Sequence, residues 1–212
     1  MELENTVLTI GAHLDDPAQW GGVISRFKRE GWKNVVYLCS MSEDLPAKAY
    51  KPWADQVIAV PSPQLIHSTE VQEGIRDIVQ KCRPKIIITH NTTTWEPDHR
   101  YIAETVPSAA TRVFYEQVMR NELKIWGGDA EWEGPIANEP NAYVKIEEED
   151  LKAKIEMFKS QASPAWQKNH LGVQVKHFNN WCRVLAKWRA HCIFREEEFY
   201  EAYVSFRAIN II

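Results

Sequence analysis

Three side chains that could bind a metal or move a proton lie within four residues near the start of the chain. His13, Asp15 and Asp16 directly follow the apolar run at residues 6–10, which has the composition of a buried β-strand. Open α/β sheets bind their ligands at the carboxyl ends of such strands. Because a structural turn rarely needs a histidine and two carboxylates together, this segment is a candidate functional site.

A second pair of such residues follows a later strand. Asp98 and His99 come after the apolar run at residues 85–89 and the polar loop that follows it. Since parallel strands end at one edge of a sheet, His99 can join His13 and Asp16 there. Two imidazoles and one carboxylate suit Zn²⁺, or another divalent metal, with a fourth position left for water. This assignment leaves Asp15 as the general base.

A scaffolding role is the alternative for each of these residues. A histidine at a strand end often only hydrogen-bonds its own loop, and an aspartate before a helix is often only its N-cap. A structural role of this kind would explain a single histidine or aspartate. Two clusters on neighbouring strands favour the metal-binding interpretation.

Strands and helices alternate along the part of the chain that positions these residues. Hydrophobic periodicity predicts strands at 6–10, 34–39, 56–60, 85–89 and 142–146, and helices at 17–31, 70–82, 98–114, 147–161 and 175–190. Residues 127–141 are predicted to form a loop, and the chain after residue 146 is predicted to be mainly helical, with a mixed aromatic and aliphatic segment at residues 198–211. The βαβ order predicts an α/β, Rossmann-like, mostly parallel sheet with helices on both faces. Without a linker or repeat, residues 1–212 are predicted to form a single domain.

Composition excludes several classes of protein. The net charge of −4 and the absence of a basic block argue against nucleic-acid binding. His13 and the acids after it interrupt the first apolar stretch, and no basic segment precedes it, so we expect a cytoplasmic protein without a membrane span. The four cysteines lack paired spacing and are expected to be reduced thiols. A homo-oligomer is left open.

The motifs around these residues carry a resemblance. The first reads Ala-His-Leu-Asp-Asp-Pro at residues 12–17, with Gly21 and Gly22 after it, and the second reads Glu-Pro-Asp-His-Arg at residues 96–100. The chain resembles the LmbE-like N-acetylglucosaminyl deacetylases, which include N-acetylglucosaminyl-phosphatidylinositol de-N-acetylase. Their motifs read Ala-His-Pro-Asp-Asp-Glu, followed by Gly-Gly, and His-Pro-Asp-His-Arg.

The resemblance implies a zinc hydrolase with a small-molecule substrate. Its activity would be removal of the acetyl group from an N-acetylated amino sugar or sugar conjugate, through a metal-bound water that Asp15 activates. The zinc ligands carried over are His13, Asp16 and His99, the same three residues expected from the strand ends. Asp98 would orient a ligand or catalytic group from the second shell, or else only cap its helix.

One departure from the family pattern puts the chemistry in doubt. Glu96 stands where the family has a histidine that is thought to stabilise the oxyanion or protonate the leaving amine. A carboxylate can do this only when it is protonated. Another histidine could take over the role, and the candidates are His90, His170 and His177.

Two other functions compete with deacetylation. If Glu96 disables the reaction, the chain is a catalytically impaired relative that binds a sugar or nucleotide-sugar in the same pocket. A dinucleotide-binding protein is disfavoured, because the first turn lacks Gly-x-Gly-x-x-Gly.

Substrate contacts are expected from loops at the same sheet edge. Lys48 and Lys51 follow the second strand and could hold a phosphate or a sugar hydroxyl, although both could be ordinary solvated lysines. Trp95 could stack on a sugar ring, as could Trp53 and Trp132. His90 is a further candidate for contact with the substrate.

Overall fold

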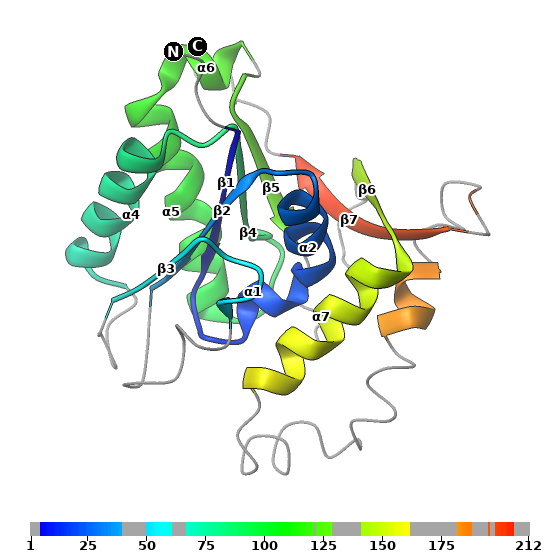
Figure 1. The fold of residues 1–212 in the computed structure, drawn as a ribbon. Coiled ribbons are helices and arrows are strands. Elements are labelled where there is room, and N and C mark those ends of the chain that lie inside the picture. The colour runs from blue at the N-terminus through cyan, green and yellow to red at the C-terminus, as the bar shows by residue number, and fades with distance from the viewer. Residues whose placement is uncertain are drawn as a thin grey trace.

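The structure is a computed structural model. It describes residues 5–39, 50–60, 67–120, 122–128, 141–161, 182–187, 195 and 198–205. Seven strands form one sheet (Figure 1). They are β1 (Thr6–Gly11), β2 (Lys33–Leu38), β3 (Gln56–Ala59), β4 (Ile86–His90), β5 (Lys124–Gly128), β6 (Ala142–Ile146) and β7 (Phe199–Ser205).

The sheet is mostly parallel, as the sequence predicts. The strand order is β3-β2-β1-β4-β5-β7-β6, and β1 to β5 all pair in parallel. From β1 the chain first moves to β2 and β3, and later returns to the other side of β1 as β4. This reversal creates a topological switch point between β1 and β4, where a ligand crevice is expected at the carboxyl ends of the strands.

Helices cover both faces of the sheet. They are α1 (Asp16–Gln19), α2 (Gly21–Arg29), α4 (Thr69–Cys82), α5 (Pro97–Val113), α6 (Tyr115–Met119) and α7 (Glu148–Gln161). In Figure 1, α4 and α5 lie together on one side of the strands, and α2 and α7 lie on the other.

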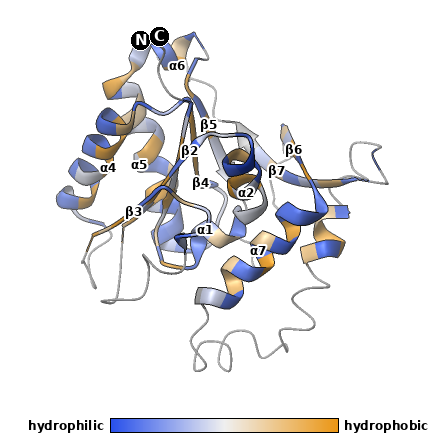
Figure 2. Cartoon of the chain, in the orientation of Figure 1, coloured by the Kyte–Doolittle hydropathy of each residue, from blue (hydrophilic) through white to orange (hydrophobic). Residues whose placement is uncertain are grey.

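The core divides into two hydrophobic clusters because successive strand side chains point to opposite faces. Val7 packs in the cluster that includes α2 and α7, whereas its neighbour Leu8 packs in the cluster that includes α4 and α5. The covering helices are amphipathic, and Figure 2 shows hydrophilic and hydrophobic residues alternating along α4 and α7. Both faces of the central strands are therefore buried, which suits the continuous apolar runs in the sequence.

Two strands differ from the sequence-based prediction. The sequence predicts a loop from residue 127 and no element at residues 124–126, but Lys124–Gly128 pairs with β4 as strand β5. The C-terminal segment was expected to be mainly helical or mixed, but Phe199–Ser205 forms β7, which is antiparallel to β5 and β6. Both segments are short and rely on sheet neighbours, so local periodicity predicts them poorly.

The first predicted helix is divided. The chain leaves its helical path at Trp20, and α1 and α2 lie on either side of that residue. Gly21 and Gly22 follow directly, where a Cβ would lie 2.9 Å from Lys154 Cα and 2.8 Å from Glu201 Oε1. The double glycine therefore allows α2 to pack closely against α7 and β7.

A buried ion pair ties β7 to the start of α2. Lys154 Nζ lies 2.8 Å from Glu201 Oε1, and both residues are 2% exposed. Glu201 accepts hydrogen bonds from the backbone amides of Gly22 and Val23 and from the hydroxyl of Tyr203. A buried charge must be paired or hydrogen-bonded in this way. The C-terminal strand thus anchors the segment that follows the first motif.

Two other expectations concern the chain as a whole. No helix in the described part of the chain is long and apolar enough to cross a membrane. Cys39, Cys82 and Cys182 are free thiols, and Cys192 lies outside the described residues. The single domain over residues 1–212 stays a prediction.

Candidate metal centre

The first motif occupies a tight turn at the carboxyl end of β1. Gly11 ends the strand, and a Cβ at this position would lie 3.0 Å from Asp16 Cβ and from Pro17 Cδ. Glycine therefore allows the chain to fold back on itself. Pro17 is the second residue of α1, in the first turn, where its missing N–H costs no hydrogen bond. The turn projects His13 and Asp16 toward the switch point between β1 and β4.

His13, Asp16 and His99 meet there. One ligand atom from each residue lies within 4.8 Å of the others. His13 Nδ1 is 3.2 Å from His99 Nε2, His99 Nε2 is 3.2 Å from Asp16 Oδ1, and His13 Nδ1 is 3.7 Å from Asp16 Oδ2. Ligands that bind one tetrahedral zinc at about 2.0–2.2 Å lie about 3.3–3.6 Å apart. The spacing and chemistry of this donor set therefore fit a divalent cation.

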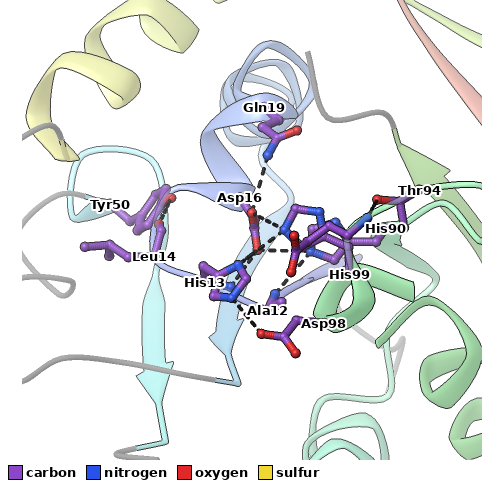
Figure 3. Close-up of polar contacts among 11 residues, drawn as sticks. Ala12, His13, Leu14, Asp16, Gln19, Tyr50, His90, Thr94, Asp98 and His99 are labelled. Carbon is purple, nitrogen blue, oxygen red and sulfur yellow. Dashed lines mark hydrogen bonds and ion pairs between the residues drawn. The ribbon is translucent and has the colours of Figure 1, made fainter. Parts of the chain in front are cut away.

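Asp16 is the most enclosed member of the set. Its side chain is 1% exposed, and it accepts hydrogen bonds from the His13 amide at 2.5 Å and from Gln19 Nε2 at 3.3 Å (Figure 3). Burial opposes the charge of this carboxylate, but His90, 3.0 Å away, and the hydrogen bonds from His90 and His99 hold its pKa well below the usual range. Asp16 is thus kept ionised, as a metal ligand must be.

His90 lies behind the three candidate ligands. It ends β4, is 1% exposed, and stacks on His99 with ring centroids 4.0 Å apart. Its Nε2 lies 3.0 Å from Asp16 Oδ2 and 3.2 Å from the amide nitrogen of Ala12 (Figure 3). Complete burial lowers the pKa of His90, although Asp16 offsets part of that effect. This buried ring supports Asp16 and faces other site residues instead of solvent.

Asp15 has a different environment from Asp16. It occupies the N-cap position of α1, but its side chain makes no capping hydrogen bond. Burial, and then the neighbouring charge of Asp16, raise the pKa of Asp15 to about 6. A base near that pKa accepts a proton efficiently around neutral pH. The simple N-cap explanation of this aspartate is therefore not supported by its contacts.

Asp98 contacts two imidazoles. Its Oδ2 lies 3.2 Å from His13 Nε2, the ring nitrogen on the far side from the candidate metal position (Figure 3). Its Oδ1 lies 3.0 Å from His67 Nε2. A carboxylate on the outer nitrogen of a ligating histidine fixes the orientation of the ring. The N-cap of α5 is Glu96, so capping does not explain Asp98.

The remaining predicted residues lie around this centre or outside the described structure. Glu96 is partly buried at the N-cap of α5, and its side chain makes no capping bond. Trp95 is 67% exposed beside it. Lys51 is exposed next to Tyr50, whose hydroxyl donates to Leu14 O at 2.6 Å. Four of the predicted residues lie outside the described residues: Lys48, Trp132, His170 and His177.

The sequence alone does not single out His67, which appears there as one polar residue before a helix.

The fold matches solved structures of known proteins, while searches of protein-family profiles and of curated proteins found no match. One is the 4-carboxy-2-hydroxymuconate hydratase GalB of Pseudomonas putida KT2440, with a TM-score of 0.71, 13% identity, and coverage of 98% of this chain and 99% of that one. Another is the N,N'-diacetylchitobiose deacetylase of Pyrococcus horikoshii, with a TM-score of 0.67, 16% identity, and coverage of 96% and 84%. A third is the zinc-inhibited form of the teicoplanin deacetylase Orf2, with a TM-score of 0.66, 14% identity, and coverage of 97% and 100%.

The chain shares the fold of these three proteins. The resemblance inferred from two short motifs is therefore confirmed by the arrangement of the whole described sheet and its helices. At these identities the similarity concerns the fold. Because a hydratase and two deacetylases share this fold, the fold by itself does not specify the activity.

Proposed function

We propose that this chain is a metal-dependent hydrolase that removes the acetyl group from an N-acetylated amino sugar or sugar conjugate. The observation that carries the proposal is the convergence of His13, Asp16 and His99 beside Asp15. A deacetylase of N,N'-diacetylchitobiose and one of teicoplanin share the fold. Zn²⁺ is the proposed cation, because two imidazoles and a carboxylate form a ligand set that zinc commonly takes.

Each residue of the site has a separate role in the proposed reaction. A cation held by the three ligands polarises a carbonyl group and makes a water molecule more acidic. Asp15 accepts a proton from the attacking water, since its carboxylate makes no capping hydrogen bond. Asp98 and the buried His90 hold His13 and Asp16 in place. The products are acetate and a free amine.

The proposed substrate contacts come from the rim of the site. Trp95 is exposed next to Glu96 and offers an indole face to a sugar ring. Lys51 lies in the turn that Tyr50 ties to Leu14, so it is close to the first motif. Lys48 and the cytoplasmic location remain predictions, as does the oligomeric state.

Glu96 favours a second candidate function. An ionised carboxylate accepts hydrogen bonds but has no proton to donate to a leaving amine. A protein with this substitution could bind a sugar or nucleotide-sugar at the same site without hydrolysing it. Deacetylation is preferred because the candidate ligands and Asp15 are all in place.

Metal analysis and acetate release test the two functions together. The purified protein is expected to contain close to one zinc or other divalent ion per chain, which His13→Ala loses. Acetate release is then measured over a panel of N-acetylglucosamine derivatives, with Glu96→His in parallel. Turnover by the natural sequence supports the deacetylase. Binding of a sugar without turnover, with activity gained only in Glu96→His, supports the second function. A metal-free protein would contradict both.

A further inference from the structure

The candidate centre has a buried side and an exposed side. The side chains of Asp16 and His99 are 1% and 4% exposed, whereas those of His13 and Asp98 are 36% and 33% exposed. A substrate in water can approach only from the exposed side. Any residue that transfers a proton to the substrate must also lie there.

His67 lies on this exposed side. Its side chain is 51% exposed, and it directly precedes Ser68, the N-cap of α4. Its Nε2 is 3.0 Å from Asp98 Oδ1, and its ring packs on Tyr101 with ring centroids 4.4 Å apart. The hydroxyl of Tyr101 in turn donates to Ser68 O at 3.2 Å. An exposed histidine with two such contacts is held in a defined orientation.

Asp98 links His67 directly to the centre. One carboxylate oxygen lies by His67, and the other lies 3.2 Å from His13 Nε2. A carboxylate beside an imidazole orients the ring, as in many catalytic pairs. In the described part of the chain, the other histidines near the centre are unsuitable as donors to a substrate. His13 and His99 are candidate metal ligands, and His90 is 1% exposed.

We propose that His67, oriented by Asp98, donates the proton that the leaving amine needs during deacetylation. This inference rests on the proposed function. As the water oxygen bonds to the carbonyl carbon, Asp15 takes one proton from the water. The C–N bond then breaks while the nitrogen takes a proton from His67. The products are acetate and an amine, and His67 regains its proton from solvent.

This assignment explains how the chain can keep activity despite Glu96. The acid would come from the residue before the N-cap of α4 instead of from the N-cap of α5. Both helices begin at the same edge of the sheet and pack together, and Asp98 in the first turn of α5 contacts His67. Glu96 need not carry a proton in this arrangement.

The test compares His67→Ala with Arg76→Ala. Arg76 is a matched control because it lies on α4 and is half-exposed, with an ion pair to the adjacent Asp77 at 3.7 Å. On the best substrate of the acetate panel, His67→Ala is expected to lower kcat by about 100-fold, with KM within about threefold. Metal content should be unchanged, and Arg76→Ala should behave like the natural sequence.

Chemical rescue separates an acid from a structural residue. Because His67 is half-exposed, its removal leaves room for small acids from solution. Imidazole and a series of substituted imidazoles, at concentrations that leave the natural sequence unaffected, are expected to restore part of the lost rate. The restored rate should change systematically with the pKa of the added compound.

Each other outcome has a distinct meaning. Full activity in His67→Ala overturns this inference but leaves the proposed function standing. Loss of activity without rescue, or together with the metal, also overturns it, since His67 would then only support the structure. A natural sequence that binds metal but deacetylates no substrate overturns the proposed function and this inference with it.

Discussion

The two sides of the centre hold their residues in different ways. On the buried side, Asp16 is enclosed by the His13 amide from the turn, by Gln19 of α1 and by His90 at the end of β4. On the exposed side, Asp98 holds His13 and His67 at the start of α5, in contact with solvent. Buried hydrogen bonds to a charged group contribute more free energy than exposed ones. The buried side should therefore dominate metal affinity and stability, and the exposed side should dominate turnover.

The largest expected effect comes from removing the charge at the bottom of the centre. Asp16→Asn keeps the shape of the side chain but loses the anionic ligand. We expect a loss of nearly all bound metal, measured by elemental analysis, and of all measurable acetate release. Glu149→Gln, which changes an exposed carboxylate, is the control. Retention of stoichiometric metal in Asp16→Asn would exclude Asp16 as a ligand.

Asp15→Asn should separate metal binding from catalysis. The amide cannot accept a proton, so kcat is expected to fall by about 10²–10⁴-fold. Metal content should stay close to that of the natural sequence, because Asp15 is not one of the three converging ligands. Loss of the metal in this variant would show that the two aspartates do not have separate roles.

His90→Phe examines the support behind Asp16. Phenylalanine can keep the stacking on His99 but removes the contact with Asp16. We expect metal affinity to fall by about 10–100-fold, and the free energy of unfolding to fall by about 1–3 kcal/mol. Metal titration and urea denaturation measure the two quantities. Unchanged values would mean that the buried side depends on other contacts.

Asp98→Asn should have the smallest effect on stability. Because Asp98 is one-third exposed, the free energy of unfolding is expected to change by less than about 1 kcal/mol. Metal affinity should fall by about tenfold through the looser His13, and acetate release should fall further. If stability drops as much as in His90→Phe, the contrast between the two sides is wrong.

The sequence predicts those residues of the candidate metal centre that lie close to the end of a predicted strand. His13, Asp16 and His99 could be placed together because parallel strands share an edge. His67 could not be found in this way, since its contact with Asp98 spans 31 positions and arises from the packing of α4 against α5. No local sequence pattern around His67 predicts its contact with Asp98.

The strands also divide into those that local sequence predicts and those that depend on distant contacts. The central strands carry continuous apolar runs that indicate burial on both faces, and they were predicted. Strand β5 ends in two glycines, one of which packs against Trp20, while β7 carries the buried Glu201 in its middle. From the sequence alone, the glycines of β5 and the charge of Glu201 argue against buried strands. Only the contacts with Trp20 and Lys154 explain why these residues are buried. Those partners lie far away along the chain.

The contact between Glu201 and the start of α2 has a consequence for synthesis of the protein. The amide of Val23 emerges from the ribosome 178 positions before the carboxylate that it binds. At about 5–20 residues per second, that interval lasts about 9–36 s. Throughout it, the segment next to the first motif lacks its anchor, and over the last 47 positions Lys154 also lacks its counter-charge. The segment next to the first motif is therefore open to proteases and chaperones until β7 has been synthesised.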